Sequence, residues 1–583
     1  MKVNEIKENK ENKFKNDYIN YTLIIIASII ICIPLFSSKF NIFRDDGIQH
    51  VSRIIETYNT LEAKEFLPNI MIKLCNNFGY SWNIFYSPLT AYLPLIFKIF
   101  NISFVNCLKL FMFLVTLISG FAMYKFIEKV TKNKKIATLG AIFYLLAPYR
   151  ITDMYIRVAI AELTSFIFIP IVFNGLYTII NEKRKSLLLA FGAIGLILTH
   201  TVITLYTAIL CFMYLLIFIK KLKDKEILKI LGLNILSIIL ISSFFLVGLL
   251  QHYNEGIYEV FVPGRMEDAS KLEYFKTRFY QLFYTKAENP MIFEIGLVIV
   301  VGLILTPIAW KKIPNEYKKI YILFLILGLV LTFMTFTFFP FERLPRILKM
   351  LQFTFRLFEF TSLFFSFIAA INYGILIKNF KTLDVIVLGI ITSLLIIPYN
   401  KKIDYDIQEN EERLIKGVQV TENTGRIHAG MASMEYLPTN VYKSLRTYIA
   451  IREDIPIIKK IDKENINEEL KKIKIENYNK NGTNMSFEIN NLNEDIKMEL
   501  PYIYYLGYRV KVNENEIKYN QSENGFIEIN LNKQELKSDK VKVEVKYLGT
   551  NEMIISYIIS IISLVVFIIV EIGFKKSERK IKK

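Results

Sequence analysis

A long apolar stretch near the N-terminus decides the fold of this chain: Tyr18-Ile-Asn-Tyr-Thr-Leu-Ile-Ile-Ile-Ala-Ser-Ile-Ile-Ile-Cys-Ile-Pro-Leu-Phe-Ser-Ser38. A helix needs about 20 mainly apolar residues to cross the hydrocarbon core of a bilayer, and this stretch has that length. No Ala-x-Ala-like cleavage site follows it. We therefore predict a signal anchor that stays in the membrane as the first of several spans.

Similar apolar stretches recur along the chain, and 53% of its 583 residues are hydrophobic. The sequence predicts a polytopic α-helical membrane protein with about twelve transmembrane helices. We expect the segment 86–100 to be an interfacial helix instead, because it is short and contains Pro88 and Pro94. The predicted spans are 18–38, 105–124, 136–149, 158–180, 186–199, 202–219, 228–250, 292–310, 320–340, 358–377, 383–398 and 552–574.

The distribution of Lys and Arg predicts the orientation of these spans. If the N-terminus is cytoplasmic, every short inside segment is basic, as the positive-inside rule requires. We therefore predict a multi-pass protein of the cell membrane with both termini in the cytoplasm. The net charge of +18 then reflects this orientation, and we expect no nucleic-acid partner.

The spans divide the chain into four predicted parts. They are a cytoplasmic tail (1–17), a transmembrane domain (18–398) whose first outside loop is 39–104, an extracytoplasmic domain (399–551), and a last span with a basic tail (552–583). Residues 501–512 are rich in β-forming residues, and 525–531 and 541–547 alternate with period two. With turn residues between them, these three segments predict strands. We expect the extracytoplasmic domain to be β-sandwich-like.

The first candidate site follows the first span directly, in Asn41-Ile-Phe-Arg-Asp45-Asp46-Gly-Ile-Gln-His50-Val-Ser-Arg53. Asp46, His50 and Arg53 would share one face of a helix over about 47–62. Either aspartate could be a general base or a ligand of a divalent cation, and the basic neighbours could bind phosphate. The alternative is an Asp45 or Asp46 helix cap with solvated neighbours.

The second candidate site lies between the third and fourth predicted spans and contains Arg150, Asp153, Arg157 and Glu162. Glu162 is the most informative of these, since charge inside an apolar span is costly and usually functional. The alternative is an internal Arg157–Asp153 ion pair that only fixes the end of a helix.

Two further residues lie at predicted outside ends of spans. Arg356 could bind a lipid phosphate, or its side chain could extend to the interface without any such role. His200 could contribute to the same site, or be a hydrogen-bonded structural residue. The chain has no P-loop, Gly-x-Ser-x-Gly, His-Glu-x-x-His or dinucleotide motif, which argues against nucleotide-driven transport, serine hydrolysis and zinc proteolysis.

With these residues, the chain resembles the bacterial multi-pass membrane proteins named for a 6-pyruvoyl-tetrahydropterin-synthase-related domain. Its layout is similar to that of the GT-C glycosyltransferases, which have an acidic pair in the first outside loop and a C-terminal outside domain. Relatives often have Pro-Trp before the last arginine, where this chain has Thr354-Phe355. The matching stretches are Asp45-Asp46-Gly-x-x-His50-x-x-Arg53, Pro148-Tyr-Arg150-x-x-Asp153-x-Tyr155-x-Arg157-x-Ala-x-x-Glu162 and Gln352-Phe-x-x-Arg356.

The resemblance implies a membrane glycosyltransferase that moves a sugar from a polyprenyl-phosphate donor to an envelope glycan, lipid or protein on the outer face. It implies catalytic roles for Asp45, Asp46 and Glu162, with Mg²⁺ or Mn²⁺ as a cofactor that the two aspartates could hold. Two alternatives stay open: a transporter or flippase of lipid-linked glycans, and a non-enzymatic membrane protein that binds envelope glycans. The predicted substrate-binding residues are His50, Arg53, Arg150, Asp153, Arg157, His200 and Arg356.

Overall fold

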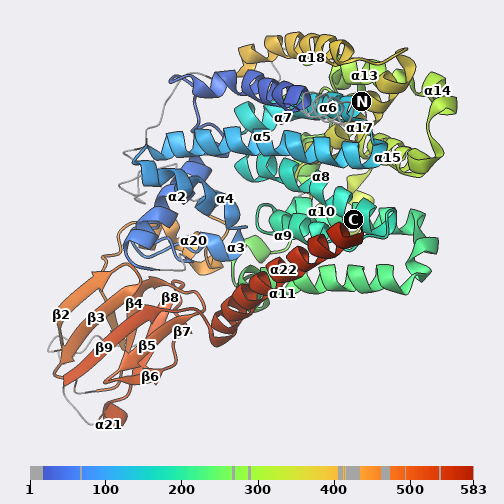
Figure 1. The fold of residues 1–583 in the computed structure, drawn as a ribbon. Coiled ribbons are helices and arrows are strands. Elements are labelled where there is room, and N and C mark those ends of the chain that lie inside the picture. The colour runs from blue at the N-terminus through green and yellow to red at the C-terminus, as the bar shows by residue number, and fades with distance from the viewer. Residues whose placement is uncertain are drawn as a thin grey trace.

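The computed structural model consists of a helical bundle with a β-sheet region at one end (Figure 1). The structure describes residues 18–65, 69–265, 269–286, 291–404, 411, 414, 434–460, 473–492, 494–536 and 540–581. The predicted cytoplasmic tail (1–17) and much of 405–433 lie outside these residues.

Eight helices in the described residues are long and apolar enough to cross a membrane. Each overlaps a predicted span, so a multi-pass helical architecture is confirmed. They are Tyr18–Phe36, α5 (Phe104–Thr131), α8 (Ile160–Ile180), α11 (Lys225–Glu255), α15 (Asn315–Met334), Thr354–Leu376 with α17 (Leu357–Leu376), Thr382–Lys402 with α18 (Thr382–Ile396), and α22 (Asn551–Ile581).

The other four predicted spans form helices that are shorter than a full crossing, so the count of about twelve stays a prediction. These helices are α6 (Lys134–Leu145), α9 (Leu188–Ile197), α10 (Thr201–Ile217) and α13 (Leu297–Ile304), which α14 (Thr306–Ala309) follows. The predicted interfacial segment 86–100 forms α4 (Leu89–Tyr92) and a 3-10 helix (Leu93–Phe100).

Helices α8 and α17 lie at the centre of the bundle, and nearly all of their residues are buried. By contrast, α18 and α22 expose most of their apolar side chains, as lipid-facing helices do. Glu162 lies in the first turn of α8, and Arg356 directly precedes α17. The two central helices therefore bring Arg356 close to Glu162 of the second candidate site.

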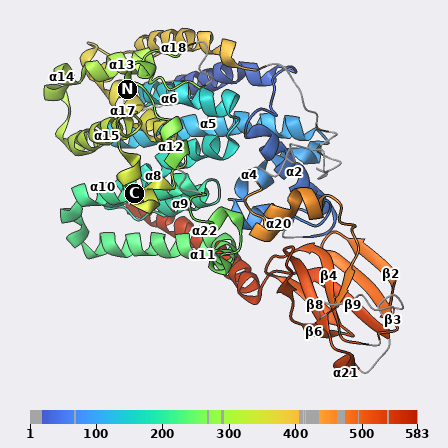
Figure 2. The same ribbon diagram turned by 180° about the vertical axis from the view of Figure 1, so that it is seen from behind.

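A layer of short helices lies between the bundle and the sheets, as both views show (Figures 1 and 2). The longest is α2 (Gly47–Glu62), at the position predicted for a helix in the first loop. Helices α3 (Trp82–Phe85) and α20 (Thr439–Ser444) lie in the same layer (Figure 1). Further short helices in the described residues are α7 (Pro148–Ile151), α12 (Ala269–Tyr274), α16 (Arg346–Lys349) and α21 (Lys533–Leu536), of which α21 lies at the end of the sheets away from the bundle (Figures 1 and 2). A π-helical turn (Thr152–Ile156) follows α7.

Two antiparallel sheets form the β region, with strand orders β1-β4-β8-β7 and β2-β3-β9-β5-β6. The predicted strand 501–512 is in fact divided between the two sheets, because a turn at Gly507 separates β4 from β5. The strands are β1 (Ile457–Lys460), β2 (Lys474–Asn481), β3 (Asn484–Asn490), β4 (Ile496–Ile503), β5 (Tyr508–Val512), β6 (Asn515–Ile517), β7 (Asn520–Gln521), β8 (Phe526–Leu531) and β9 (Lys540–Tyr547).

The buried core of the β region includes residues from far earlier in the chain. Apolar side chains of 70–85, in the first loop, pack with those of both sheets. The Arg452 guanidinium lies over the rings of Phe78 and Phe526, at 5.2 and 4.5 Å, and so joins the loop to the sheet. The first loop and the β region therefore share one core.

Candidate functional site

Asp46 lies at the N-terminal boundary of α2, but its side chain does not cap that helix. The Asp46 carboxylate instead accepts a 3.1 Å hydrogen bond from Arg157, and the Asp46 backbone N–H donates to the Arg157 carbonyl at 3.0 Å. The Asp46 side chain is 49% exposed, whereas that of Arg157 is 5% exposed. Asp46 is thus the accessible edge of an otherwise buried group of charges.

Gly47 allows this close approach of two segments. A Cβ atom at Gly47 would lie 1.9 Å from the Ile42 carbonyl oxygen and 2.9 Å from Val158 Cβ. Val158, next to Arg157, has a φ of +50°, a conformation that β-branched residues rarely adopt. Backbone strain of this kind persists only where the surroundings enforce it, and it often accompanies a functional site.

Glu162 is the centre of the buried charges. Its carboxylate accepts hydrogen bonds from Arg157 at 2.8 Å, from Arg356 at 2.8 Å and from the Tyr149 hydroxyl at 3.1 Å. Such charge-assisted bonds are stronger than neutral ones, and they compensate Glu162 for the loss of water. Glu162 therefore fixes two arginines side by side, and its own oxygens are occupied.

Arg157 also bonds Asp153 at 3.1 Å, so the predicted Arg157–Asp153 contact is present. It does more than fix a helix end, because Arg157 joins Asp153, Glu162 and Asp46 together. Burial and the nearby Glu162 raise the pKa of Asp153 well above its usual range, which favours a proton on Asp153.

Arg356 is buried and does not extend to an interface. Its guanidinium donates to Glu162, to the Leu351 carbonyl at 2.9 Å and to the Gln352 side chain at 2.6 Å. The ring of Phe355, in the position where Trp was expected from the resemblance, lies 4.9 Å from the Arg157 guanidinium. This cation–π contact gives the aromatic residue a role in orienting Arg157.

His200 is structural and also lies beside the cluster of buried charges around Glu162. Its Nδ1 accepts a hydrogen bond from the Ile203 backbone N–H at 3.2 Å and so caps α10. A neutral His200 then carries its proton on Nε2, which is 3.8 Å from Glu162. The ring of Tyr86 lies between His200 and His50, 6.4 Å from each.

His50 and Arg53 are buried next to the cluster. Burial, with nearby Arg53 and His200, lowers the pKa of His50 to about 3, so His50 is neutral at pH 7. Arg53 donates to Asn83, to the Tyr86 carbonyl and to the Ser87 carbonyl. It therefore holds the loop after α3.

Arg150 and Asp45 have other surroundings. Arg150 points into the bundle, where it donates to the Thr116 hydroxyl at 3.2 Å and lies 4.8 Å from the Phe166 ring. Asp45 is 53% exposed and faces Arg44 at 3.7 Å. The structure thus groups Asp46, Asp153, Arg157, Glu162, His200 and Arg356, with His50 and Arg53 beside them.

Sequence reasoning missed Tyr149, Tyr86 and Glu359. Glu359 lies on α17 and is fully buried, and neither carboxyl oxygen has a hydrogen-bond partner in the described residues. It is within electrostatic reach of Arg150, Asp153, Glu162 and Arg356. The sequence did contain a signal for Glu359, because an ionisable residue within an apolar span usually has a functional role.

The two aspartates of the first loop are a poor fit to a divalent cation. Asp45 faces Arg44 and Asp46 faces Arg157, so a cation would have to replace an arginine at each carboxylate. Among the residues that the structure describes, no group of three or more His, Cys, Asp or Glu side chains could hold a metal ion. We derive no catalytic step through a metal.

The apolar helices, with buried charges between them, show that this is a multi-pass membrane protein. Residues 84–401, more than half of the chain, match the family model of the 6-pyruvoyl-tetrahydropterin synthase related domain, described as a membrane protein. The chain belongs to this family, as its motifs predicted. Asp153, Arg157, Glu162, His200 and Arg356 lie inside the matched range, and Asp46 precedes it.

One relative is similar over nearly its whole length. An uncharacterized protein of Lactococcus lactis subsp. cremoris (strain MG1363) is 25% identical over 566 residues, which cover 89% of this chain and 90% of that protein. The similarity therefore extends through both the helical bundle and the β region.

Proposed function

We propose that this chain is a GT-C-like membrane glycosyltransferase, which moves a sugar from a polyprenyl-phosphate donor to a cell-envelope acceptor. The observation that carries the proposal is the half-exposed Asp46 carboxylate, bonded to one of two arginines that Glu162 holds side by side. Glycosyl transfer needs a base for the acceptor and positive charge for the departing phosphate, and this cluster offers both.

In this reaction the acceptor hydroxyl attacks the anomeric carbon of the donor sugar. The bond between that carbon and the phosphate oxygen breaks, and the polyprenyl phosphate leaves with the electron pair. Asp46 takes the proton of the hydroxyl, while Arg157 and Arg356 stabilise the charge on the phosphate. Because the oxygens of Glu162 are occupied, we assign Glu162 the positioning of both arginines rather than proton transfer.

We also propose that the cluster and the β region face the outside, with both termini in the cytoplasm. Basic residues at the far end of the bundle support this orientation, since Lys129 and Lys132 pair with Glu182 there, and Lys183 pairs with Asp224. Each of these residues lies in a segment that the positive-inside rule places in the cytoplasm. A lipid-borne donor and an envelope acceptor would then meet at the Asp46 edge.

A second function is favoured by one specific observation. Glu359 and Arg150 are fully buried in the bundle with unpartnered polar atoms in the described residues. Ionisable groups inside a membrane often mark a transport path. A flippase or transporter of lipid-linked glycans is therefore the second candidate.

Donor consumption tests the first proposal against the second. Protein in nanodiscs is incubated with a panel of polyprenyl-phosphate sugars and envelope extract, and released polyprenyl phosphate is measured by mass spectrometry. We expect Asp46→Asn to slow release by about 10²–10⁴-fold, the usual contribution of a general base. Asp45→Asn, the matched neighbour that faces Arg44, should stay within a few-fold of the unmodified protein.

Two results would overturn the proposal. One is that the folded, unmodified protein consumes no donor, which would favour lipid-linked glycan transport. The other is that Asp46→Asn and Asp45→Asn release polyprenyl phosphate equally fast, which would remove Asp46 from the chemistry.

A further inference from the structure

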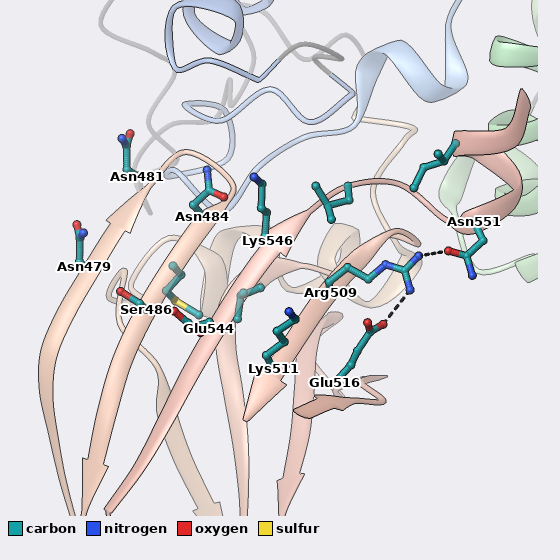
Figure 3. Close-up of a pocket in the computed structure, with 14 residues that line it drawn as sticks. Asn479, Asn481, Asn484, Ser486, Arg509, Lys511, Glu516, Glu544, Lys546 and Asn551 are labelled. Atoms are coloured by element: carbon teal, nitrogen blue, oxygen red, sulfur yellow. Dashed lines mark hydrogen bonds and ion pairs between the residues drawn. The ribbon is translucent and has the colours of Figure 1, made fainter. Parts of the chain in front are cut away.

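A pocket of about 760 Å³ lies over one face of the five-stranded sheet (Figure 3), and none of its lining residues belongs to the charged cluster. Its 14 lining residues come from β2, β3, β5, β6, β9, the segment that joins β9 to α22, and the start of α22. The sheet supplies polar and charged side chains, and the start of α22 supplies an apolar edge. This division suggests a ligand with a polar part and an apolar part.

The apolar edge of the pocket lies at the start of a candidate membrane span. The candidate span in α22 begins at Asn551, and both Asn551 and Ile554 line the pocket. Three residues of helix advance only about 4.5 Å, so Ile554 is within one turn of the start of the span. Leu548 also lines the pocket and is 47% exposed. The pocket therefore lies beside the end of a candidate span, which is where lipid head groups would lie if α22 crosses the membrane.

Of the charged side chains that line the pocket, two lysines have no ion-pair partner in the described residues. Arg509 donates to Glu516 at 2.8 Å and to Asn551 at 2.6 Å, so its charge is already paired (Figure 3). Glu544 pairs with Lys542, outside the pocket, at 2.7 Å. Lys511 and Lys546 are exposed and make no ion pair in the described residues. The surplus charge of the pocket is therefore positive.

Strand register places these groups on the same face. In the ladder between the neighbouring strands β5 and β9, Lys511 lies opposite Glu544 and Arg509 lies opposite Lys546. Alternate residues of a strand point to the same face, so all four side chains converge above the sheet. Asn479 and Asn481 add amide groups from β2, at the opposite rim of the pocket (Figure 3).

We propose that this pocket binds the phosphate-bearing head group of an anionic membrane lipid. Lys511 and Lys546 contact the phosphate, and the amides of Asn479 and Asn481 hydrogen-bond to head-group oxygens. Leu548 and Ile554 face the first part of the acyl chains. Among the residues that the structure describes, none that lines the pocket is aromatic, so they offer no ring on which a sugar could stack. Such a contact would fix the β region against the membrane surface.

Binding of a soluble short-chain lipid to the full-length protein tests this proposal. The probe is dihexanoyl phosphatidylglycerol, titrated onto protein in a neutral detergent, with dihexanoyl phosphatidylcholine as the neutral lipid. The variant Lys511→Gln/Lys546→Gln should weaken phosphatidylglycerol binding by about tenfold or more, because the head-group phosphate loses both of its cationic contacts.

The matched control is Lys474→Gln/Lys540→Gln, which removes the same charge from the same sheet outside the pocket. Binding by this control should stay within twofold of the unmodified protein. Equal weakening in the two double variants would overturn the proposal, since it would reveal a general effect of charge. Equal affinity for phosphatidylcholine would overturn it too, because the site would then not recognise an anionic head group.

A third titration separates the lipid from a free phosphate. Glycerol 3-phosphate has the same phosphate and glycerol but no acyl chains, so it should bind much more weakly than phosphatidylglycerol. Equal affinity for both would overturn the lipid assignment and leave a site for soluble phosphates. Because none of these titrations measures donor consumption, their failure would be independent of the proposed glycosyl transfer.

Discussion

Asp46 and Arg157 are 111 positions apart in the chain and are joined through both side chain and backbone. The carboxylate of Asp46 accepts from the guanidinium, and its N–H donates to the carbonyl of Arg157. Two bonds between the same two residues fix the first loop to the segment before α8. The exposed edge of the cluster is therefore held rigidly, as a preorganised site requires.

Loss of charge at Glu162 should be severe. In Glu162→Gln both Arg157 and Arg356 lose their shared buried partner, and breaking a buried ion pair costs about 3–5 kcal/mol. Thermal unfolding in detergent should show a clearly lower melting temperature. Glu128→Gln is the control, since its partner Lys125 is exposed and such pairs contribute about 0–1 kcal/mol. Equal shifts in the two variants would contradict the central position of Glu162.

Removal of the Glu359 carboxyl should stabilise the protein. A buried polar group without a hydrogen bond costs about 1–3 kcal/mol, and Met has a similar volume without that cost. Glu359→Met should therefore raise the melting temperature, and Glu359→Gln, which stays polar, should raise it less. If Glu359→Met lowers the melting temperature, the carboxyl has a stabilising partner and is not retained for function.

Glu56 makes stability depend on pH. Burial raises its pKa from 4.5 to about 7, although Asn59 and the Lys73 backbone N–H both donate to it. Because its pKa is higher in the folded than in the unfolded state, protonated Glu56 stabilises the folded state. This stabilisation is complete below about pH 4.5 and is lost as the pH rises through about 7. The melting temperature should fall over that window, and Glu56→Gln should flatten the dependence. An unchanged slope in the variant would assign the dependence to another group.

Turnover should not depend on a divalent cation. Asp45 and Asp46 each face an arginine, so a cation would have to compete with an arginine at each carboxylate. Chelation with EDTA should leave donor consumption unchanged, and added Mg²⁺ or Mn²⁺ should not increase it. A strict requirement for either ion would show that substrate binding rearranges the arginines around the two aspartates.

Much of the cluster could be predicted from single residues. Asp46, Arg157, Glu162 and Arg356 are charged residues at the ends of apolar segments, where charge is costly to keep. The family match confirms the membrane class that their motifs indicated. Their roles in catalysis stay a prediction, because contacts between carboxylates and arginines do not by themselves identify a substrate.

Other features could not be read from the sequence. Arg150 is only seven residues before Arg157, yet it points into the bundle, because α7 and the π-helical turn after it do not keep the regular helical period. The strand predicted at 501–512 divides between two sheets, since Gly507 adopts a φ of +110° there. The shared core of residues 70–85 and the β region depends on contacts between distant segments, which local patterns do not encode.

The rate of polyprenyl-phosphate release by Asp46→Asn, measured beside its melting temperature, tests the central claim most directly. Asp46 is half exposed, so its loss should leave the melting temperature within a few degrees of the unmodified protein while release falls by about 10²-fold or more. Release at the unmodified rate from a folded Asp46→Asn protein would contradict the claim that this edge of the cluster performs glycosyl transfer.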